Sequence, residues 1–149
     1  MVRSLEGKHA NYFEAILQLR EVTPEVLAFT EQQITKGHLP IAKIKKVQNG
    51  YDYYLTDNSF TKALGKKLQE TFGGQIINTA TLHTQKKGKE LYRGTVLFRQ
   101  ASFKKGDLVF YKGEEYMVIN RGTEIFLHQR NGGKKERVKW RDLEKIRII

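Results

Sequence analysis

Residues 41–55 read IAKIKKVQNGYDYYL, and this stretch decides the fold of the first part of the chain. Two runs of strand-forming residues, Pro40–Val47 and Tyr51–Leu55, flank the triplet Gln48-Asn49-Gly50. Asn-Gly between two such runs is a strong short-range signal for a β-hairpin. The stretch therefore predicts two strands that pair across a tight turn.

The chain before this hairpin has the pattern of a strand followed by a helix. Apolar residues alternate within Asn11–Glu21, as in a half-buried strand. Thr23-Pro24 gives a helix start, with the Thr23 side chain as the expected cap and proline at the first helical position. An apolar stripe of about four turns leads to Gly37, which we expect to end the helix in a left-handed conformation.

A second helix and a second hairpin follow. Apolar residues recur at helical spacing over Ser59–Phe72, and Gly73-Gly74 ends the helix. Its cap is expected from Thr56, Asp57 or Asn58. Strands are predicted at residues 75–84 and 90–98, joined by the basic turn QKKGK. The first six elements have the order of a split ferredoxin-like unit, in which two helices cover one antiparallel sheet. A different α/β sandwich is the alternative.

The pattern changes after residue 98. Short apolar runs such as LVFY at 108–111 and YMVI at 116–119 are separated by Gly-containing turns. Such spacing is typical of a small β-barrel, and about 50 residues suits the SH3-like kind. We therefore predict an α+β protein, with a β-α-β-β-α-β-β antiparallel sandwich as domain 1–98 and an SH3-like β-barrel as domain 99–149.

The charge balance points to a polyanionic partner. Lys and Arg total 27 against 16 acids, which gives a net charge of +11 and a pI near 9.8. A folded basic domain of this kind is typical of nucleic-acid binding, with simple solubility or a lysine-rich thermophilic composition as alternatives. The absence of cysteine excludes disulfides, thiolate zinc sites and cysteine nucleophiles. No signal peptide or membrane span is visible, so the cytoplasm is the expected compartment.

Basic residues gather in turns and on one predicted strand, where a folded scaffold presents them to solvent. Phosphate neutralisation needs such cations, because the release of counterions drives binding. The predicted RNA-binding residues are Lys43, Lys45, Lys86, Lys87, Lys89, Lys104, Lys105, Lys134, Lys135, Arg137, Lys139 and Arg141. A solvated surface is the alternative, and for Lys66-Lys67 the two interpretations are equally weighted.

Aromatic residues of the first hairpin offer a second kind of contact. Tyr51, Tyr53 and Tyr54 could stack on unpaired bases, although such residues more often fill a core. Alternation puts Tyr51 and Tyr53 on one face of the strand and Tyr54 on the other. Trp140 is expected to anchor the barrel core.

Nothing in the sequence proposes catalysis. The four histidines occur in unrelated segments without metal-ligand spacing, and Asp107 follows a glycine in a turn, where aspartate is common for local reasons. No phosphate-binding loop or metal pair is present. We predict no catalytic site, no metal and no cofactor, and keep an RNA-processing enzyme and a protein-only scaffold as alternatives.

Three motifs resemble a known family. NYFEAILQLR at 11–20 resembles the opening of the central part of the large ribosomal subunit export adaptor, originally named nonsense-mediated decay protein three. NGYDYYL at 49–55, with the helix after it, is similar to that family's Gly-hydrophobic-Asp-aromatic-aromatic strand and helix. KGDLV at 105–109 resembles the entry into its final barrel. The resemblance spans roughly residues 9–145, and the first two motifs are the distinctive ones.

The resemblance implies a role on the large ribosomal subunit. Family members combine a ribosomal-protein-like region with a barrel that resembles the hypusine-containing translation factor, and occupy tRNA sites during late maturation, near the exit site and the mobile stalk. We therefore expect a monomer off the ribosome that binds ribosomal RNA, with ribosomal proteins as further candidate partners. The chain lacks the family's paired Cys-x-x-Cys zinc region, leucine-rich export signal and acidic tail. A truncated protein or a short archaeal relative fits these departures.

Overall fold

The computed structural model of the chain describes residues 12–86, 89–122 and 124–149, with the backbone alone for residues 83–86 and 89–91. Two five-stranded sheets follow one another along the chain. The first unit comprises β1 (Ala15–Arg20), α1 (Pro24–Lys36), β2 (Ile41–Val47), β3 (Gly50–Leu55), α2 (Asn58–Phe72), β4 (Gly74–Lys86) and β5 (Lys89–Gln100). The second comprises β6 (Leu108–Tyr111), β7 (Glu114–Arg121), β8 (Ile125–Gln129), β9 (Lys135–Val138), the 3₁₀ helix η1 (Trp140–Lys145) and β10 (Arg147–Ile148). The predicted α+β class is confirmed.

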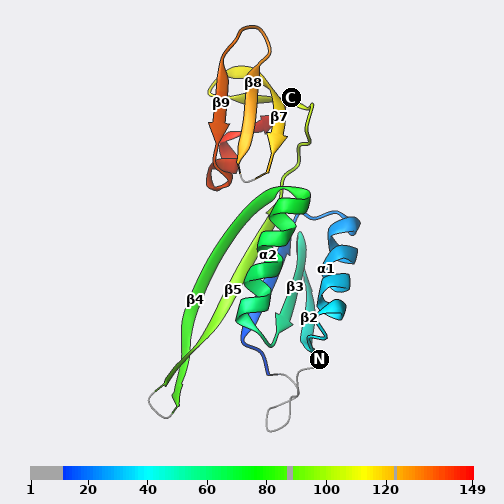
Figure 1. The fold of residues 1–149 in the computed structure, drawn as a ribbon, viewed down its shortest axis with the longest axis vertical. Helices are drawn as coiled ribbons and strands as arrows, with labels where there is room; N and C mark the ends of the chain where they lie inside the picture. The colour runs from blue at the N-terminus through cyan, green and yellow to red at the C-terminus, as the bar shows by residue number, and fades with distance from the viewer. Residues whose placement is uncertain (1–11, 87–88, 123) are drawn as a thin grey trace.

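The molecule is elongated, with the second unit at one end of its long axis and the end of β4 and the start of β5 at the other (Figure 1). β1 pairs with β5 only between Gly94 and Arg99, so the outer part of the hairpin continues with two strands alone in the described structure. We call this part, residues 81–86 and 89–93, the ribbon.

The pairing of the first sheet corrects the ferredoxin-like expectation. Its strand order is β2-β3-β1-β5-β4, and every pair is antiparallel except β1 and β5, which run parallel. The physical reason is the long β4–β5 hairpin. After α2 the chain enters the sheet at its edge as β4, and the hairpin then returns β5 into the position beside β1. The sheet is therefore the other α/β sandwich that the sequence left open.

The core of the first unit lies between this sheet and the helices α1 and α2 (Figure 1). Alternate residues of the central strands point into it, as the period of a strand requires. Leu17 and Leu19 of β1 and Phe98 of β5 have no exposed surface, and Val26 of α1 and Leu68 of α2 meet them from the helical side. Among the described residues, no helix covers the opposite face of the sheet.

The helix ends confirm some predictions and correct others. Asp57 caps α2, because its Oδ1 accepts a hydrogen bond from the Phe60 N–H at 2.9 Å. The predicted Thr23 side-chain cap on α1 is wrong: only the Thr23 carbonyl accepts, from Val26 and Leu27. Pro24 does occupy the first turn, where its missing N–H has no cost.

Gly37 does not end α1 in the predicted left-handed conformation. Its φ is −79°, and the left-handed residue is the next one, His38, with φ of 52°. Glycine fits position 37 for a different reason. An added Cβ would lie 2.5 Å from Cε2 of Phe60, so the absence of a side chain makes room for that ring.

The predicted hairpin forms, and its glycine has an unexpected role. Val47 pairs with Gly50, so the turn consists of Gln48 and Asn49, and Asn49 takes the positive φ of 70°. Gly50 lies in β3, where an added Cβ would sit 1.8 Å from the Leu19 carbonyl oxygen. Glycine is needed there because the backbone of β1 passes so close.

The second unit is an antiparallel sheet of order β10-β6-β7-β8-β9 curled around its own apolar residues, the SH3-like form that was predicted. Trp140 anchors its core as expected, 5% exposed, with its ring stacked on Phe103 and its Nε1–H donating to the Gly122 carbonyl at 2.9 Å. Tyr116 and Ile125 are fully buried beside it.

Backbone-directed hydrogen bonds join the two units. The Arg121 guanidinium of β7 donates to the Phe72 carbonyl at the end of α2. Gln75 of β4 donates to the Arg141 carbonyl in η1 at 3.3 Å, and the Ala101 N–H donates to the Gly73 carbonyl at 3.1 Å. The barrel therefore rests on the end of α2 and the start of β4.

Candidate nucleic-acid interface

The face of the first sheet that α1 and α2 leave uncovered is called the open face here. Its side chains alternate with core residues along β1, β3 and β5, and apart from Asp52 they are half-buried or exposed. They are Ile16, Gln18 and Arg20 on β1, Lys43 and Lys45 on β2, Asp52 and Tyr54 on β3, Gln75 and Ile77 on β4, and Thr95, Leu97 and Arg99 on β5. The open face thus combines several cations with an aromatic ring and an apolar floor.

Cations lie against aromatic rings at one end of the open face. The Arg93 guanidinium is 4.0 Å from the centroid of the Phe13 ring, and its Nε–H donates to the Phe13 carbonyl at 3.2 Å. Phe13 meets Tyr54 edge to face at 4.9 Å, and Lys43 Nζ lies 5.6 Å from the Tyr54 centroid. We call Phe13, Lys43, Tyr54 and Arg93 the ring cluster. Cation–π attraction holds both cations beside the rings.

Asp52, which the sequence shows as an isolated carboxylate, is bound in an ion pair. Arg20 Nη1 lies 2.7 Å from Asp52 Oδ1 and also donates to the carbonyls of Leu19 and Tyr51. Both side chains are largely buried, at 17% and 10% exposed. Arg20 therefore holds strands β1 and β3 together and neutralises Asp52, so that Lys43 and Lys45 dominate the charge of this region.

The outer surface of β7, β8 and β9 forms a second candidate interface, which we call the barrel face. Val118, Leu127 and Val138 point into the core, so their neighbours along each strand point outward. The outward residues are Met117, Ile119, Phe126, His128, Lys135 and Arg137. Four of them, Ile119, Phe126, His128 and Lys135, border a hollow of about 420 Å³. The Arg137 guanidinium lies 5.3 Å from the Phe126 ring centroid.

All nine predicted RNA-binding residues with described side chains are exposed. Three of them have an acid within 4.0 Å: Lys134 with Glu114, Arg137 with Glu124, and Arg141 with Asp142. The other six have no ion pair within the described part of the chain, and they are Lys43, Lys45, Lys104, Lys105, Lys135 and Lys139. Exposed pairs of this kind are weak and easily exchanged for phosphate.

The predicted cations are not gathered on one surface. Lys43 and Lys45 share the open face, and Lys135 and Arg137 share the barrel face. Lys104 and Lys105 precede β6 in a turn that Asp107 closes, because its carboxylate accepts the Lys104 N–H at 2.7 Å. The prediction for Lys86, Lys87 and Lys89 lies outside the described side chains, and Lys87 lies outside the described residues altogether.

Of the three hairpin tyrosines, only Tyr54 belongs to the open face. Tyr53 is 2% exposed, its hydroxyl donates to Glu31 at 3.3 Å, and Tyr51 packs against the same core. Burial, together with the nearby Glu31 carboxylate, raises the pKa of Tyr53 to about 12. Tyr51 and Tyr53 are therefore core residues, and base stacking by this strand is limited to Tyr54.

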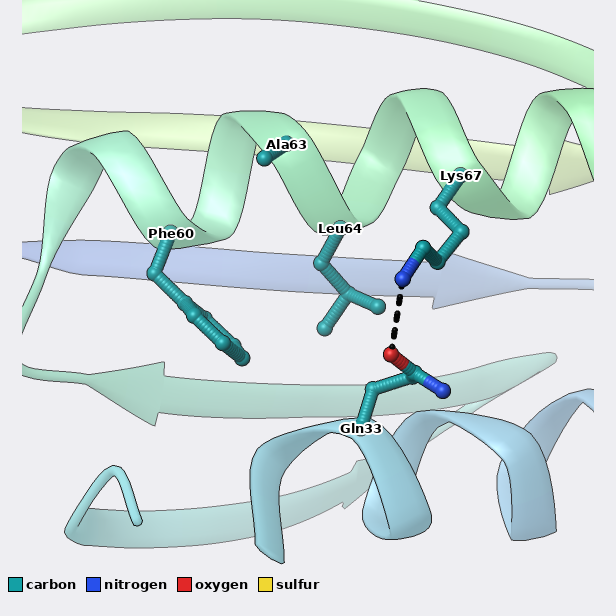
Figure 2. A pocket seen from close by; sticks show the side chains of 5 residues that line it. All are labelled: Gln33, Phe60, Ala63, Leu64 and Lys67. Carbon is teal, nitrogen blue, oxygen red and sulfur yellow. Dashed lines mark hydrogen bonds between the residues drawn. The ribbon is translucent and has the colours of Figure 1, made fainter. Parts of the chain in front are cut away.

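The hollows beside these surfaces are open or small: the one on the barrel face, of about 420 Å³, is open to solvent. Figure 2 shows a hollow between the helices, where Lys67 Nζ donates to Gln33 Oε1 at 3.1 Å beside Phe60 and Leu64. Its volume of about 80 Å³ is far below the roughly 300–1,000 Å³ of ligand pockets. Lys66 and Lys67 are both exposed, so both interpretations of this pair stay open.

Metal-ligating groups are likewise scattered: in residues 12–149, apart from the undescribed positions, no three His, Asp or Glu side chains come together. Within the same ranges, no helix has the length and apolar character needed to cross a bilayer.

Sequence reasoning missed the residues that tertiary structure brings beside the lysines. Arg93 and Phe13 are 80 positions apart in the chain, and only the β1–β5 pairing joins them. A usable signal did exist in β5: Val96 and Phe98 alternate with Arg93, Thr95, Leu97 and Arg99, which places both arginines opposite the core face. For Met117, Ile119 and Phe126 of the barrel face, no feature of the sequence distinguished these surface residues from core residues.

Comparison with known proteins identifies one family. The family model described as "NMD3, second domain" matches residues 12–99, more than half of the chain. No curated protein sequence matches the chain significantly. One solved structure, "Crystal Structure of MjSpt4:Spt5 complex conformation A", contains a chain that is 15% identical, with 90% of this chain and 97% of that chain covered and a TM-score of 0.33. A likeness that distant carries no argument about function.

Proposed function

The chain belongs to the NMD3 family, and from this premise we propose that it binds ribosomal RNA on the large ribosomal subunit without catalysing a reaction. The family is one of adaptors associated with the large subunit. RNA binding by this particular chain, and the residues that carry it, are our proposal.

One observation supports the proposal above the others. Six of the nine predicted cations with described side chains are exposed lysines, spread over both units, that have no acid partner within the described part of the chain, in a protein of net charge +11. Unpaired surface ammonium groups condense on polyanions and release counterions as they bind. Because these lysines are spread along the long axis, they suit an extended RNA surface that the protein recognises by its shape and its phosphates.

The proposal includes the more detailed expectations that the family resemblance implies. The second unit corresponds to the family's final barrel. The protein occupies tRNA sites near the exit site and the mobile stalk late in maturation. A monomer off the ribosome, contacts with ribosomal proteins, residence in the cytoplasm and an archaeal origin complete it. The division into domains 1–98 and 99–149 also stays a prediction.

The proposal is tested by co-sedimentation of the protein with separated ribosomal subunits and by titration of naked large-subunit RNA over a range of salt. We expect selective binding to the large subunit. Affinity for the naked RNA should fall by about three to five decades between roughly 50 and 200 mM salt if about six to ten phosphates are contacted. Affinity independent of salt would contradict the proposal, and binding to the subunit but not to its RNA would favour the protein-only scaffold.

Matched pairs of substitutions locate the contact. Lys43→Ala with Lys45→Ala removes two charges from the open face, and Lys36→Ala with Lys62→Ala removes two exposed charges from α1 and α2 on the covered side. We expect the first pair to lower the slope of log affinity against log salt by about 1.4–1.8, and the second pair to leave it nearly unchanged. Equal effects of the two pairs would mean that the open face has no special part in binding.

A further inference from the structure

We propose that the open face binds unpaired RNA nucleotides, with bases stacked against the Tyr54–Phe13 ring pair and phosphates on Lys43 and Lys45. This inference rests on the proposed function and specifies the form of RNA that this face selects. It is carried by the ring cluster, whose four residues come from the segment before β1 and from the strands β2, β3 and β5.

The rings of the cluster are not part of the hydrophobic core. Tyr51, Tyr53 and Leu55 supply the core contribution of β3, and Tyr54 between them points to the opposite face. Phe13 likewise packs on Tyr54 and Arg93 rather than on the buried cluster beneath the helices. Aromatic rings on a helix-free sheet face are the platform on which RNA-binding sheets stack unpaired bases.

The cations of the cluster are positioned for the same ligand. Arg93 and Lys43 flank the two rings, and a guanidinium plane can itself stack on a base. Lys45 projects from the same face of β2 two residues further on, about 7 Å along the strand. Phosphates of a strand whose bases rest on the rings would therefore meet two ammonium groups in succession.

Of the two acids near the cluster, Asp52 is paired with an arginine and Glu14 is hydrogen-bonded to a neutral hydroxyl. Asp52 lies opposite Lys45 in the sheet, but Arg20 neutralises it at 2.7 Å. Glu14 accepts a hydrogen bond from the Tyr12 hydroxyl at 2.7 Å. A half-buried ring pair on an open sheet face, beside cations, discriminates between forms of RNA, because bases within a duplex are stacked on one another and present no free face. Single strands, loops and bulges are the expected ligands.

The test uses the full chain, a short unstructured RNA oligonucleotide and the same oligonucleotide annealed into a duplex. We expect the single strand to bind more tightly than the duplex. Tyr54→Leu should weaken single-strand binding roughly 5- to 150-fold, the range for loss of one stacked base, without changing its salt dependence. The matched variant Tyr54→Phe keeps the ring and should bind like the unmodified protein. Lys43→Ala should instead reduce the salt slope by about 0.7.

The outcomes separate this inference from the proposed function. If the large subunit and its RNA bind but Tyr54→Leu has no effect, or if the duplex binds as tightly as the single strand, the open face does not stack bases and this inference alone fails. A ribosomal protein that binds the open face in place of RNA would overturn it too. If the unmodified protein binds no RNA at all, both the proposed function and this inference are wrong. Circular dichroism of Tyr54→Leu and Tyr54→Phe must show the same melting temperature, so that a difference in affinity reports the ring.

Discussion

The two five-stranded sheets of this protein bury their cores in different ways. In the first unit the sheet stays open, and α1 and α2 close one face while no helix of the described residues covers the other (Figure 1). In the second unit the sheet curls around its own side chains, with Trp140 at the start of η1 closing the core. A core made by one curled sheet depends on no helix from elsewhere, so we expect the barrel to keep its structure when the first unit is disturbed.

The largest expected effect comes from Phe98→Ala. Phe98 is fully buried between the first sheet and its helices, and truncation of such a residue costs about 3–5 kcal/mol of unfolding free energy. The only tryptophan, Trp140, lies in the barrel core and borders Gly73 at the junction, so its fluorescence reports mainly on the second unit. We expect the transition seen by circular dichroism to move to lower denaturant concentration while the fluorescence transition stays nearly in place.

A matched substitution in the barrel should have the opposite effect on the two transitions. Phe103 is 1% exposed and stacks on Trp140, so Phe103→Ala should move the fluorescence transition and spare the first unit. If either variant shifts both transitions together, the two units unfold as one cooperative body and the contrast between them is wrong.

A smaller effect is expected at alkaline pH, where each unit carries one buried tyrosine with a carboxylate nearby. Burial raises the pKa of Tyr53 to about 12, and burial raises the pKa of Tyr116 beside Glu114. Because the native state holds the proton that the unfolded chain loses near pH 10, this stabilisation is complete below pH 10 and disappears as the pH rises toward 12. For Tyr53 the loss is about 2–3 kcal/mol.

Phenylalanine at each position separates the two contributions. Tyr53→Phe should remove part of the alkaline destabilisation from the circular dichroism transition, and Tyr116→Phe should remove it from the fluorescence transition. Measurement of both transitions between pH 8 and 12 checks this sign, and a first unit that becomes more stable above pH 10 would contradict it.

The smallest expected effect concerns the junction between the units. Arg121→Ala removes the charged donor to the Phe72 carbonyl, a loss of about 1–2 kcal/mol of coupling between barrel and α2. We expect the two unfolding transitions to move further apart, with neither core disrupted. Arg121→Lys, which keeps a donor of the same charge, should restore part of the coupling. If the two transitions of the alanine variant stay as far apart as in the unmodified protein, the remaining contacts of β4 with η1 are enough to couple the two units.

Local chemistry made much of the fold predictable. The hairpin at residues 41–55 and the Asp57 cap follow from short-range rules that hold whatever surrounds them. The parallel pairing of β1 with β5 does not follow from such rules, because strand order is decided by which edges are free when the long hairpin returns. Gly37 was misjudged because its reason is the approach of Phe60 from another helix.

The candidate site was likewise predictable where it depends on short-range rules, and not where it depends on tertiary contacts. Exposure of Lys43 and Lys45 was predictable from their alternation with apolar residues in one strand. That Lys134 and Arg137 have acid partners was not, since Glu114 and Glu124 reach them from other strands and turns. Tyr54 was separable from Tyr53 by alternation alone, but its neighbours Phe13 and Arg93 required the tertiary fold.

The ribbon gives the molecule a span that its compact parts lack. Six residues of β4 beyond the sheet add roughly 20 Å of reach, in the direction away from the barrel (Figure 1). Two weak attachments at opposite ends of one body act together, because the first raises the effective concentration of the second. An isolated RNA fragment that meets one end would then be held loosely, and an assembled subunit that offers both surfaces at the right separation would be held tightly.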